Sequence, residues 1–322
     1  MRQQIRYFQF CPGIPWQVNF GKILPKISQE VWDDHIKNKE IVILAHNGLL
    51  EAFWSLSILR AINSVEPLLK ASWAGNEAFK DLISACSGSN YVSFPDVGAK
   101  YPTPIFMDKA KTIYFNCLNN YITTKTYKLK NNKPNNKPLL QQIFINSLLP
   151  WNKKYIPKLN NFDYTNYKKW CKSINFFDNK KFILIIDKTI YSQHNIDYLN
   201  WDNKNILNLA GLMNRFGIEI LYCSDKKIYN NQLIHMIPEN DLSILIPLIE
   251  KCWIILSRDI DYLLIAMMIS QANIISNKLN AKNQKSYDIY NNAEFLEAEN
   301  MIYSYKGNLD PHEVYSLVEG LI

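Results

Sequence analysis

The chain of 322 residues is 48% hydrophobic and 20% charged, with a net charge of +7. At about 150 residues per domain, this length predicts two domains or one large one. The hydrophobic fraction is that of a globular protein and excludes a wholly disordered chain. No dense cluster of lysine and arginine indicates a nucleic-acid surface, so nucleic acid is not an expected partner.

No targeting or membrane-spanning segment is expected. The N-terminal stretch MRQQIRYFQFCPGIPW lacks the uninterrupted apolar core of a signal peptide, and no stretch reaches the ~20 apolar residues of a membrane span. The six cysteines form no C-x-x-C pair, which argues against a zinc site or a disulfide framework. Cys223 and Cys252 lie in apolar runs and are predicted to be buried thiols. We therefore expect a soluble protein of the reducing cytoplasm.

The first regular pattern begins with the apolar run Ile41–Ala45, which is typical of a strand buried on both faces. The polar turn His46-Asn47-Gly48 follows, and from Leu49 the apolar residues recur with helical spacing. Strands and helices continue to alternate, which indicates a parallel sheet. The further elements expected here are strands at Leu68–Trp73, Tyr91–Phe94 and Thr112–Phe115 and a helix over Asn76–Ala85.

A second series of strands and helices follows the polar segment Lys128–Pro138, which is typical of an exposed loop or linker. Gly217 stands where a helix C-cap belongs, and Pro311 is expected in the first turn of a closing helix. The other elements expected here are helices at Tyr164–Ile174, Asn203–Phe216, Leu242–Cys252 and Asp259–Ser270 and strands at Lys181–Ile186, Ile218–Tyr222, Trp253–Leu256 and Ile274–Ile275.

This pattern predicts an α/β protein with two Rossmann-like, doubly wound domains that face a cleft. We place the first domain at residues 1–150, the second at residues 151–308 and a closing helix at residues 309–322. In such folds ligands bind at the carboxyl ends of the strands. The residues that follow the strands are therefore candidates: His46, Asn47, Gly48 and Glu51 in the first domain, and Asp187, Lys188, Ser224, Asp225, Ser257, Arg258 and Asp259 in the second.

Four stretches carry a further pattern: AHNGLLEAFWSLSILRAI, WDNKNILNLAGLMNRFGIEILYCSD, LIPLIEKCWIILSRDIDYLLIAMMISQANIIS and LDPHEVYSLVEGLI. The first is similar to the loop and helix that open the acceptor domain of the heptosyltransferase-like glycosyltransferases of the lipopolysaccharide core. The next two resemble the donor-domain elements of that family, and the last resembles its closing helix. The resemblance covers most of the chain from Ile41 onward and implies the GT-B fold.

The resemblance also implies an activity, namely transfer of a sugar from a nucleotide-sugar donor to a hydroxyl of a glycan or other acceptor. The donor is a co-substrate, and neither a further cofactor nor a metal is implied. Glu51 falls at the family's first-domain acid and would be the general base, with His46 as the other candidate. Arg258 and Lys188 would neutralise the leaving diphosphate. The other implied contacts are Ser224, Asp225, Ser257 and Asp259 on the donor side and Asn47 and Gly48 in the acceptor-side loop.

The same residues also have ordinary structural explanations. The helix dipole would stabilise a carboxylate at Glu51, and Asp259 can serve as a plain N-cap. The family's donor signature is Asp, then Thr or Ser, then Gly, with His one turn on, but Ile260, Asp261 and Leu264 stand in the last three places. Thr and Gly let a phosphate approach the helix N-terminus, whereas a second carboxylate repels it. We expect Asp261 to face away from the donor.

This departure, together with only 10 glycines, motivates a second hypothesis: a non-catalytic GT-B-like module that binds a partner or supports an assembly. Three other enzyme classes are disfavoured, because the phosphate loop G-x-x-x-x-G-K-[ST], the dinucleotide fingerprint G-x-G-x-x-G and the nucleophile elbow G-x-S-x-G are all missing. Binding of a nucleotide-sugar would separate the two hypotheses.

Overall fold

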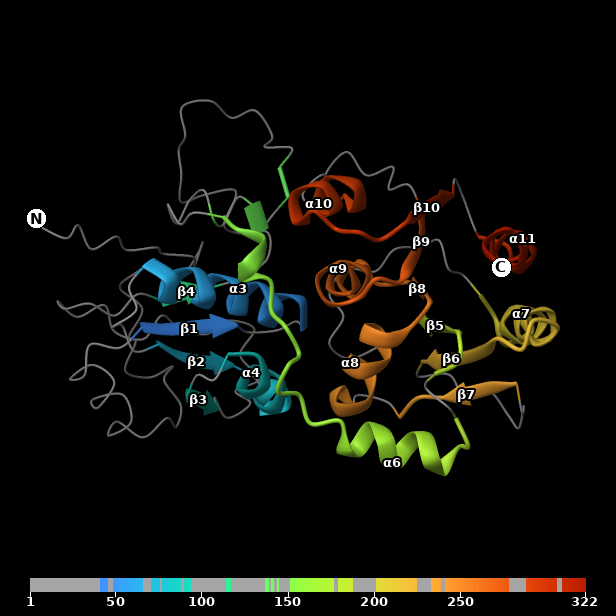
Figure 1. Ribbon diagram of the computed structural model, residues 1–322, viewed down its shortest axis with the longest axis horizontal. Coiled ribbons are helices and arrows are strands. Elements are labelled where there is room, and N and C mark those ends of the chain that lie inside the picture. Colours follow the sequence, from blue (N-terminus) through green and yellow to red (C-terminus); the bar gives the residue numbers. More distant parts are fainter. Residues whose placement is uncertain are drawn as a thin grey trace, which may run out of the picture. The chain divides into compact units, whose positions relative to one another are not determined.

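A computed structural model describes two compact units, which Figure 1 labels by element. One comprises residues 1–135 and 140–162, and the other comprises residues 136–139 and 163–322. The residues that the structure describes are 41–45, 49–65, 71–75, 77–87, 90–93, 114–116, 137–138, 140–141, 144, 151–176, 179–187, 201–224, 233–238, 241–277, 288–305 and 309–322.

The first unit contains a four-stranded parallel sheet in the order β3-β2-β1-β4 (Figure 1). The predicted strand Ile41–Ala45 is β1, and the predicted helix is α3, which spans Leu49–Val65. The strand expected at Leu68–Trp73 is β2, which spans Ala71–Gly75. It lies slightly later in the chain because its ends are set by pairing with β1, not by the local apolar run. The remaining elements are β2 (Ala71–Gly75), η1 (Glu77–Phe79), α4 (Lys80–Ser87), β3 (Asn90–Ser93), β4 (Tyr114–Asn116) and η2 (Lys153–Tyr155).

The second unit contains a six-stranded sheet in which all pairs are parallel, in the order β10-β9-β8-β5-β6-β7. The order reverses between β5 and β8, as in a doubly wound dinucleotide-binding sheet. Central strand β5 is buried along its whole length, which explains its continuous run FILII. The strands are β5 (Phe182–Ile186), β6 (Glu219–Cys223), β7 (Ile234–Met236), β8 (Ile254–Ser257), β9 (Asn273–Asn277) and β10 (Ile302–Tyr305).

The helices of the second unit largely match the sequence pattern. Helix α9 is apolar around its circumference and is buried at nearly every position, as expected for a helix enclosed by its unit. Pro247 inside α8 does not prevent the predicted helix from forming. The helices are α6 (Thr165–Ser173), α7 (Asn203–Asn214), α8 (Leu242–Lys251), α9 (Ile260–Ile269), α10 (Ile289–Leu296) and α11 (Pro311–Leu321).

The closing helix α11 packs on α7 of its own unit. The rings of Phe216 and Tyr315 stack with centroids 5.5 Å apart. The indole N–H of buried Trp201 donates to the carbonyl of Leu309, just before α11. Asp310 and Glu313 form a capping box, which satisfies the first backbone N–H groups of the helix. These contacts hold the C-terminal helix against α7 and the residues that flank it.

Two local predictions are confirmed, one about buried cysteines and one about the backbone at a helix end. Cys223 and Cys252 are 0% and 5% exposed, and both are free thiols. Gly217 has φ +66°, the left-handed conformation that a helix C-cap requires. The described helices include none that is both long and apolar enough to span a bilayer.

Candidate functional site

Polar residues meet at the carboxyl ends of β5 and β8, where the strand order of the second unit reverses. Asp187 directly follows β5, Ser257 ends β8, and Arg258 comes next. The backbone N–H of Arg258 donates to the carbonyl of Ile186 at 2.9 Å, which extends the sheet ladder past the end of β8. Because a crevice forms where neighbouring strands send their connections to opposite faces, this is the edge at which doubly wound sheets bind ligands.

Asp187 is the polar centre of this edge and is only 3% exposed. Its Oδ2 atom accepts hydrogen bonds from the Tyr222 hydroxyl at 3.1 Å and from Ser224 Oγ at 3.2 Å. Its backbone N–H donates to the Cys223 carbonyl at 2.9 Å. A buried carboxylate is tolerated only with such donors. Residues at the end of β6 therefore fix the position of Asp187, which directly follows β5.

Arg258 supplies the positive charge of the cluster. Its Nη1 atom lies 3.6 Å from Oδ1 of Asp187, and its side chain is 31% exposed against 4% for the carboxylate. That separation is an ion pair rather than a hydrogen bond. A guanidinium carries five donors in a planar fork, so Arg258 can hold Asp187 and still present donors to an anion from solvent.

The start of α9 carries two further carboxylates. The backbone N–H of Asp259 donates to Ser257 Oγ, and Oδ1 of Asp259 accepts from the N–H of Asp261, each at 3.0 Å. All three residues are buried, with Asp261 at 2% exposure. Asp259 is thus the N-cap of α9, as its structural explanation required. Among the described residues of this edge, the guanidinium of Arg258 is therefore partly exposed, whereas Asp187, Asp259 and Asp261 are buried.

The structure brings together only part of the predicted site. Ser224 and Arg258 contact Asp187. Ser257 and Asp259 lie at the adjoining end of β8 and the start of α9, where they are hydrogen-bonded to one another. Glu51 is the third residue of α3. The remaining predicted site residues lie outside the described part of the chain: His46, Asn47, Gly48, Lys188 and Asp225.

Tyr222 was missed as a site residue, because it lies within the apolar run of a buried strand. A signal was nevertheless present: Tyr222 and Ser224 are two residues apart, and alternate residues of a strand share a face. In the described residues, no group of three or more His, Cys, Asp and Glu side chains is placed to hold a metal ion.

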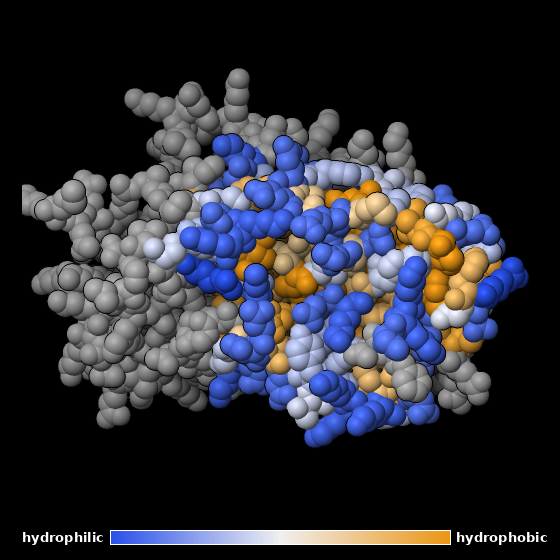
Figure 2. Space-filling view, in the orientation of Figure 1, coloured by the Kyte–Doolittle hydropathy of each residue, from blue (hydrophilic) through white to orange (hydrophobic). Residues whose placement is uncertain are grey.

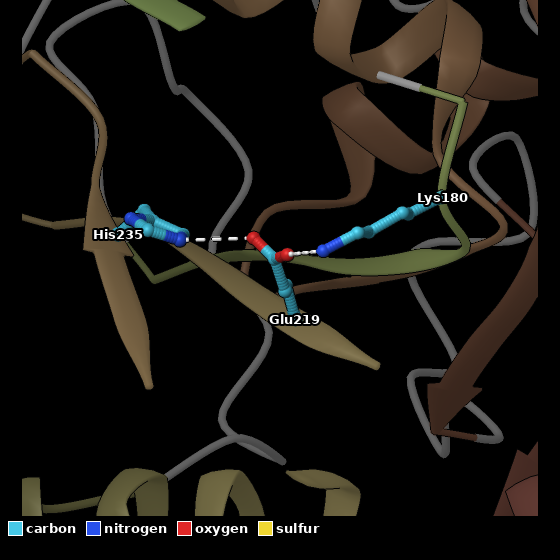
Figure 3. A network of polar contacts seen from close by, with 3 residues as sticks. All are labelled: Lys180, Glu219 and His235. Carbon is cyan, nitrogen blue, oxygen red and sulfur yellow. Dashed lines mark hydrogen bonds and ion pairs between the residues drawn. The ribbon is translucent and has the colours of Figure 1, made fainter. Parts of the chain in front are cut away.

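A second polar network lies at the opposite end of β6 (Figure 3). Glu219 opens this strand, and its two carboxylate oxygens contact Lys180 Nζ and His235 Nε2, each at 2.9 Å. The ends of β6, Glu219 and Cys223, are four residues apart along the strand. At about 3.3 Å per residue, they are roughly 13 Å apart. The network therefore ties β6 to β7 and to the approach to β5, away from the switch-point cluster.

The reversal of strand order, with a polar cluster at the carboxyl edge, defines a doubly wound sheet in the second unit. Comparison with solved structures specifies the fold further. E. coli heptosyltransferase WaaC with ADP matches 88% of this chain and 100% of its own, with a TM-score of 0.55 and 12% identity. E. coli ADP-heptose lipopolysaccharide heptosyltransferase II matches 88% of this chain and 98% of its own, with a TM-score of 0.52 and 10% identity.

A glycosyltransferase of family 9 from Veillonella parvula is similar in the same way, with 88% and 91% of the two chains covered, a TM-score of 0.53 and 11% identity. No family model and no curated protein matches the sequence. At such identities the likeness concerns the fold. The chain therefore has the α/β fold of GT-B glycosyltransferases, which confirms the fold class predicted from its sequence.

Proposed function

We propose that the protein is a glycosyltransferase that binds a nucleotide-sugar on its second unit and a hydroxyl acceptor on its first. The observation that carries this proposal is the partly exposed guanidinium of Arg258, held beside Asp187 at the switch point of a GT-B-type fold. The fold similarity to heptosyltransferases supports it, and the solved structure that contains ADP makes an ADP-sugar the first donor to test.

In the proposed reaction, charge develops on the diphosphate as the bond to the sugar breaks. Arg258, assisted by Lys188, would neutralise that charge, which is the task of a preorganised cation in such a site. Glu51 would take the proton from the acceptor hydroxyl, with His46 as the alternative base. In this scheme the side chains alone supply the electrostatic stabilisation, and a metal ion is not required.

Asp187 would act on the donor through Arg258. Two hydroxyl donors fix the carboxylate, and the carboxylate in turn restricts where the guanidinium can point. Ser224, Ser257 and Asp259 complete the polar edge, and Asp225 belongs to the same proposed donor site. Holding the cation in place before the donor arrives reduces the entropy lost on binding.

Titration calorimetry with ADP-, UDP-, GDP- and CMP-sugars tests the proposal directly. We expect one donor to bind, and Arg258→Ala to weaken its affinity about tenfold or more while the protein stays folded, because charge-assisted hydrogen bonds are worth about 1.5–3 kcal/mol. Arg215→Ala is the matched control, since Arg215 is an exposed arginine at the C-cap of α7. Equal affinities of the two variants would remove Arg258 from the donor site.

A specific observation favours the second candidate, a non-catalytic GT-B-like binding module. The N–H of Asp261 already donates to the buried carboxylate of Asp259. The positive end of α9 is thereby partly neutralised by the chain itself, which disfavours a diphosphate there. Failure of every nucleotide-sugar to bind at millimolar concentration would support this module over the enzyme.

A further inference from the structure

Helix α6 has a buried aromatic face and an outer face whose charged residues are all lysines. Tyr167, Trp170 and Cys171 are buried, as expected for positions i, i+3 and i+4 on one side of a helix. Lys168, Lys169 and Lys172 are exposed on the other side, and the sequence TNYKKWCKS contains no acidic residue. Figure 2 shows the hydrophilic surface over this helix at the lower edge of the view.

Two more lysines extend this face. Lys251, at the end of α8, lies over the rings of Tyr164 and Tyr167 with its Nζ atom 5.8 and 5.6 Å from their centroids. Lys181 lies over the ring of nearby Trp253 at 4.2 Å. Such contacts hold a lysine stem along an aromatic surface while its ammonium group stays in water. We call Lys168, Lys169, Lys172, Lys181 and Lys251 the basic surface.

Lysines outnumber acidic residues in this part of the sequence. Residues 163–181 contain five lysines and two aspartates, so their net charge is 5 − 2 = +3. These 19 residues therefore carry +3 of the chain's net charge of +7. Asp163 faces Lys168 and Lys169, and attraction to both lowers its pKa further after the stronger effect of hydrogen bonds from Thr165. Glu250 accepts a hydrogen bond from the Tyr164 hydroxyl, and Glu219 binds Lys180 and His235.

One spacing within the basic surface is unfavourable for the helix itself, although Lys172 also meets the negative end of the helix dipole in the last turn. Lys168 and Lys172 are neighbours on the helix surface at i and i+4, and like charges in that relation destabilise a helix. Neutral glutamine would serve α6 equally well, because its helix propensity is close to that of lysine. The lysines of α6 are therefore explained better by an anionic partner than by the fold.

We infer that the basic surface binds the anionic headgroups of a phospholipid bilayer. Lysines on flexible stems above a layer of aromatic rings suit a diffuse negative surface. A nucleic acid fits less well for two reasons. The basic surface contains no arginine for bidentate contacts to phosphate or base, and the rings of Tyr167 and Trp170 are buried, so they offer no face for stacking with bases.

Vesicle co-sedimentation of the full chain tests this inference. We expect binding to vesicles of phosphatidylcholine and phosphatidylglycerol but not to phosphatidylcholine alone, and we expect that binding to weaken as salt is added. Each lysine near an anionic surface contributes about fivefold in partition. The double variant Lys169→Gln, Lys172→Gln should therefore bind about 25-fold more weakly, and Lys172→Gln alone about fivefold.

The matched control is Lys204→Gln combined with Arg215→Gln, which removes the same charge from exposed positions on or next to α7. We expect less than about a twofold change, because this pair lies outside the basic surface. Thermal melting of each variant verifies folding.

Three results would overturn the inference. The first is no binding to phosphatidylglycerol vesicles, and the second is equal weakening by the two double variants, which would reduce the effect to net charge. The third is tighter binding of a random-sequence DNA or RNA oligonucleotide with the same dependence on Lys169 and Lys172.

Discussion

Nη1 of Arg258 lies 3.6 Å from Oδ1 of Asp187, and this ion pair joins the ends of two strands that are neighbours only in the folded sheet. One partner is buried and hydrogen-bonded, whereas the other is partly exposed. The pair therefore stabilises the unit weakly while it orients a cation at the proposed donor site. This difference between stability and orientation can be measured.

The coupling between the two residues should be small. In a double-mutant cycle with Asp187→Asn and Arg258→Gln, we expect a coupling free energy of about 0.5–1 kcal/mol, because water screens the partly exposed guanidinium. Urea denaturation of the four proteins measures it. A coupling above about 3 kcal/mol would indicate a fully desolvated pair instead.

Tyr222→Phe removes the hydrogen bond from the Tyr222 hydroxyl to the Asp187 carboxylate without leaving a cavity. We expect a loss of about 1–2 kcal/mol in the free energy of unfolding, since a buried acceptor loses a donor. If Asp187 orients Arg258, the nucleotide-sugar affinity of Tyr222→Phe should fall together with its stability. Loss of stability with unchanged affinity would limit Tyr222 to a structural role.

Gly211 within α7 and Gly217 just after it should respond in opposite directions to replacement by alanine. Gly217→Ala should destabilise the protein by about 1 kcal/mol or more, because φ is +66° there and no neighbour within 4 Å adds a steric effect. Gly211→Ala should stabilise it by about 0.5–1 kcal/mol, since Gly211 lies inside the helix and also has space for a Cβ. Chemical denaturation of both variants measures the contrast.

Asp163 should titrate below its ordinary value. Hydrogen bonds from the Thr165 hydroxyl and the Thr165 backbone N–H lower the pKa of this carboxyl from 3.8. Desolvation opposes them, and Lys169 and Lys168 lower the pKa by less. The stabilisation of the start of α6 is therefore present above pH 4 and is lost as the pH falls through the folded-state pKa. NMR titration should show the Asp163 pKa rising toward 3.8 in Thr165→Val. An unchanged midpoint would show that the hydroxyl has no part in the shift.

The thiol of Cys252 should be unreactive in the folded protein. Burial strongly raises the pKa of this thiol, and its Sγ also donates to the Ile249 carbonyl at 3.2 Å. Since the thiolate is the nucleophile, iodoacetamide at pH 8 should label Cys252 only after unfolding, as peptide mass mapping would show. Rapid labelling under native conditions would contradict this burial.

Some elements of the fold escaped the sequence pattern because they depend on their neighbours. Strand β7 has only three residues, and β10 is an edge strand paired on one side. Helix α10 contains two adjacent asparagines, which are poor helix formers. It relies on the Asp288 N-cap and on packing against α9. Local propensity could not reveal such short elements.

The sequence alone determined where the long buried elements lie and how several of them begin and end. The apolar run FILII, the helical spacing over Asn203–Asn214, the Asp259 N-cap and the Gly217 C-cap all follow from local chemistry. Only the tertiary structure decided the order of the strands, because pairing β5 with β8 depends on which apolar faces pack together across the whole unit. That pairing places Asp187 beside Arg258, and the register of β6 brings the Tyr222 hydroxyl to the same carboxylate.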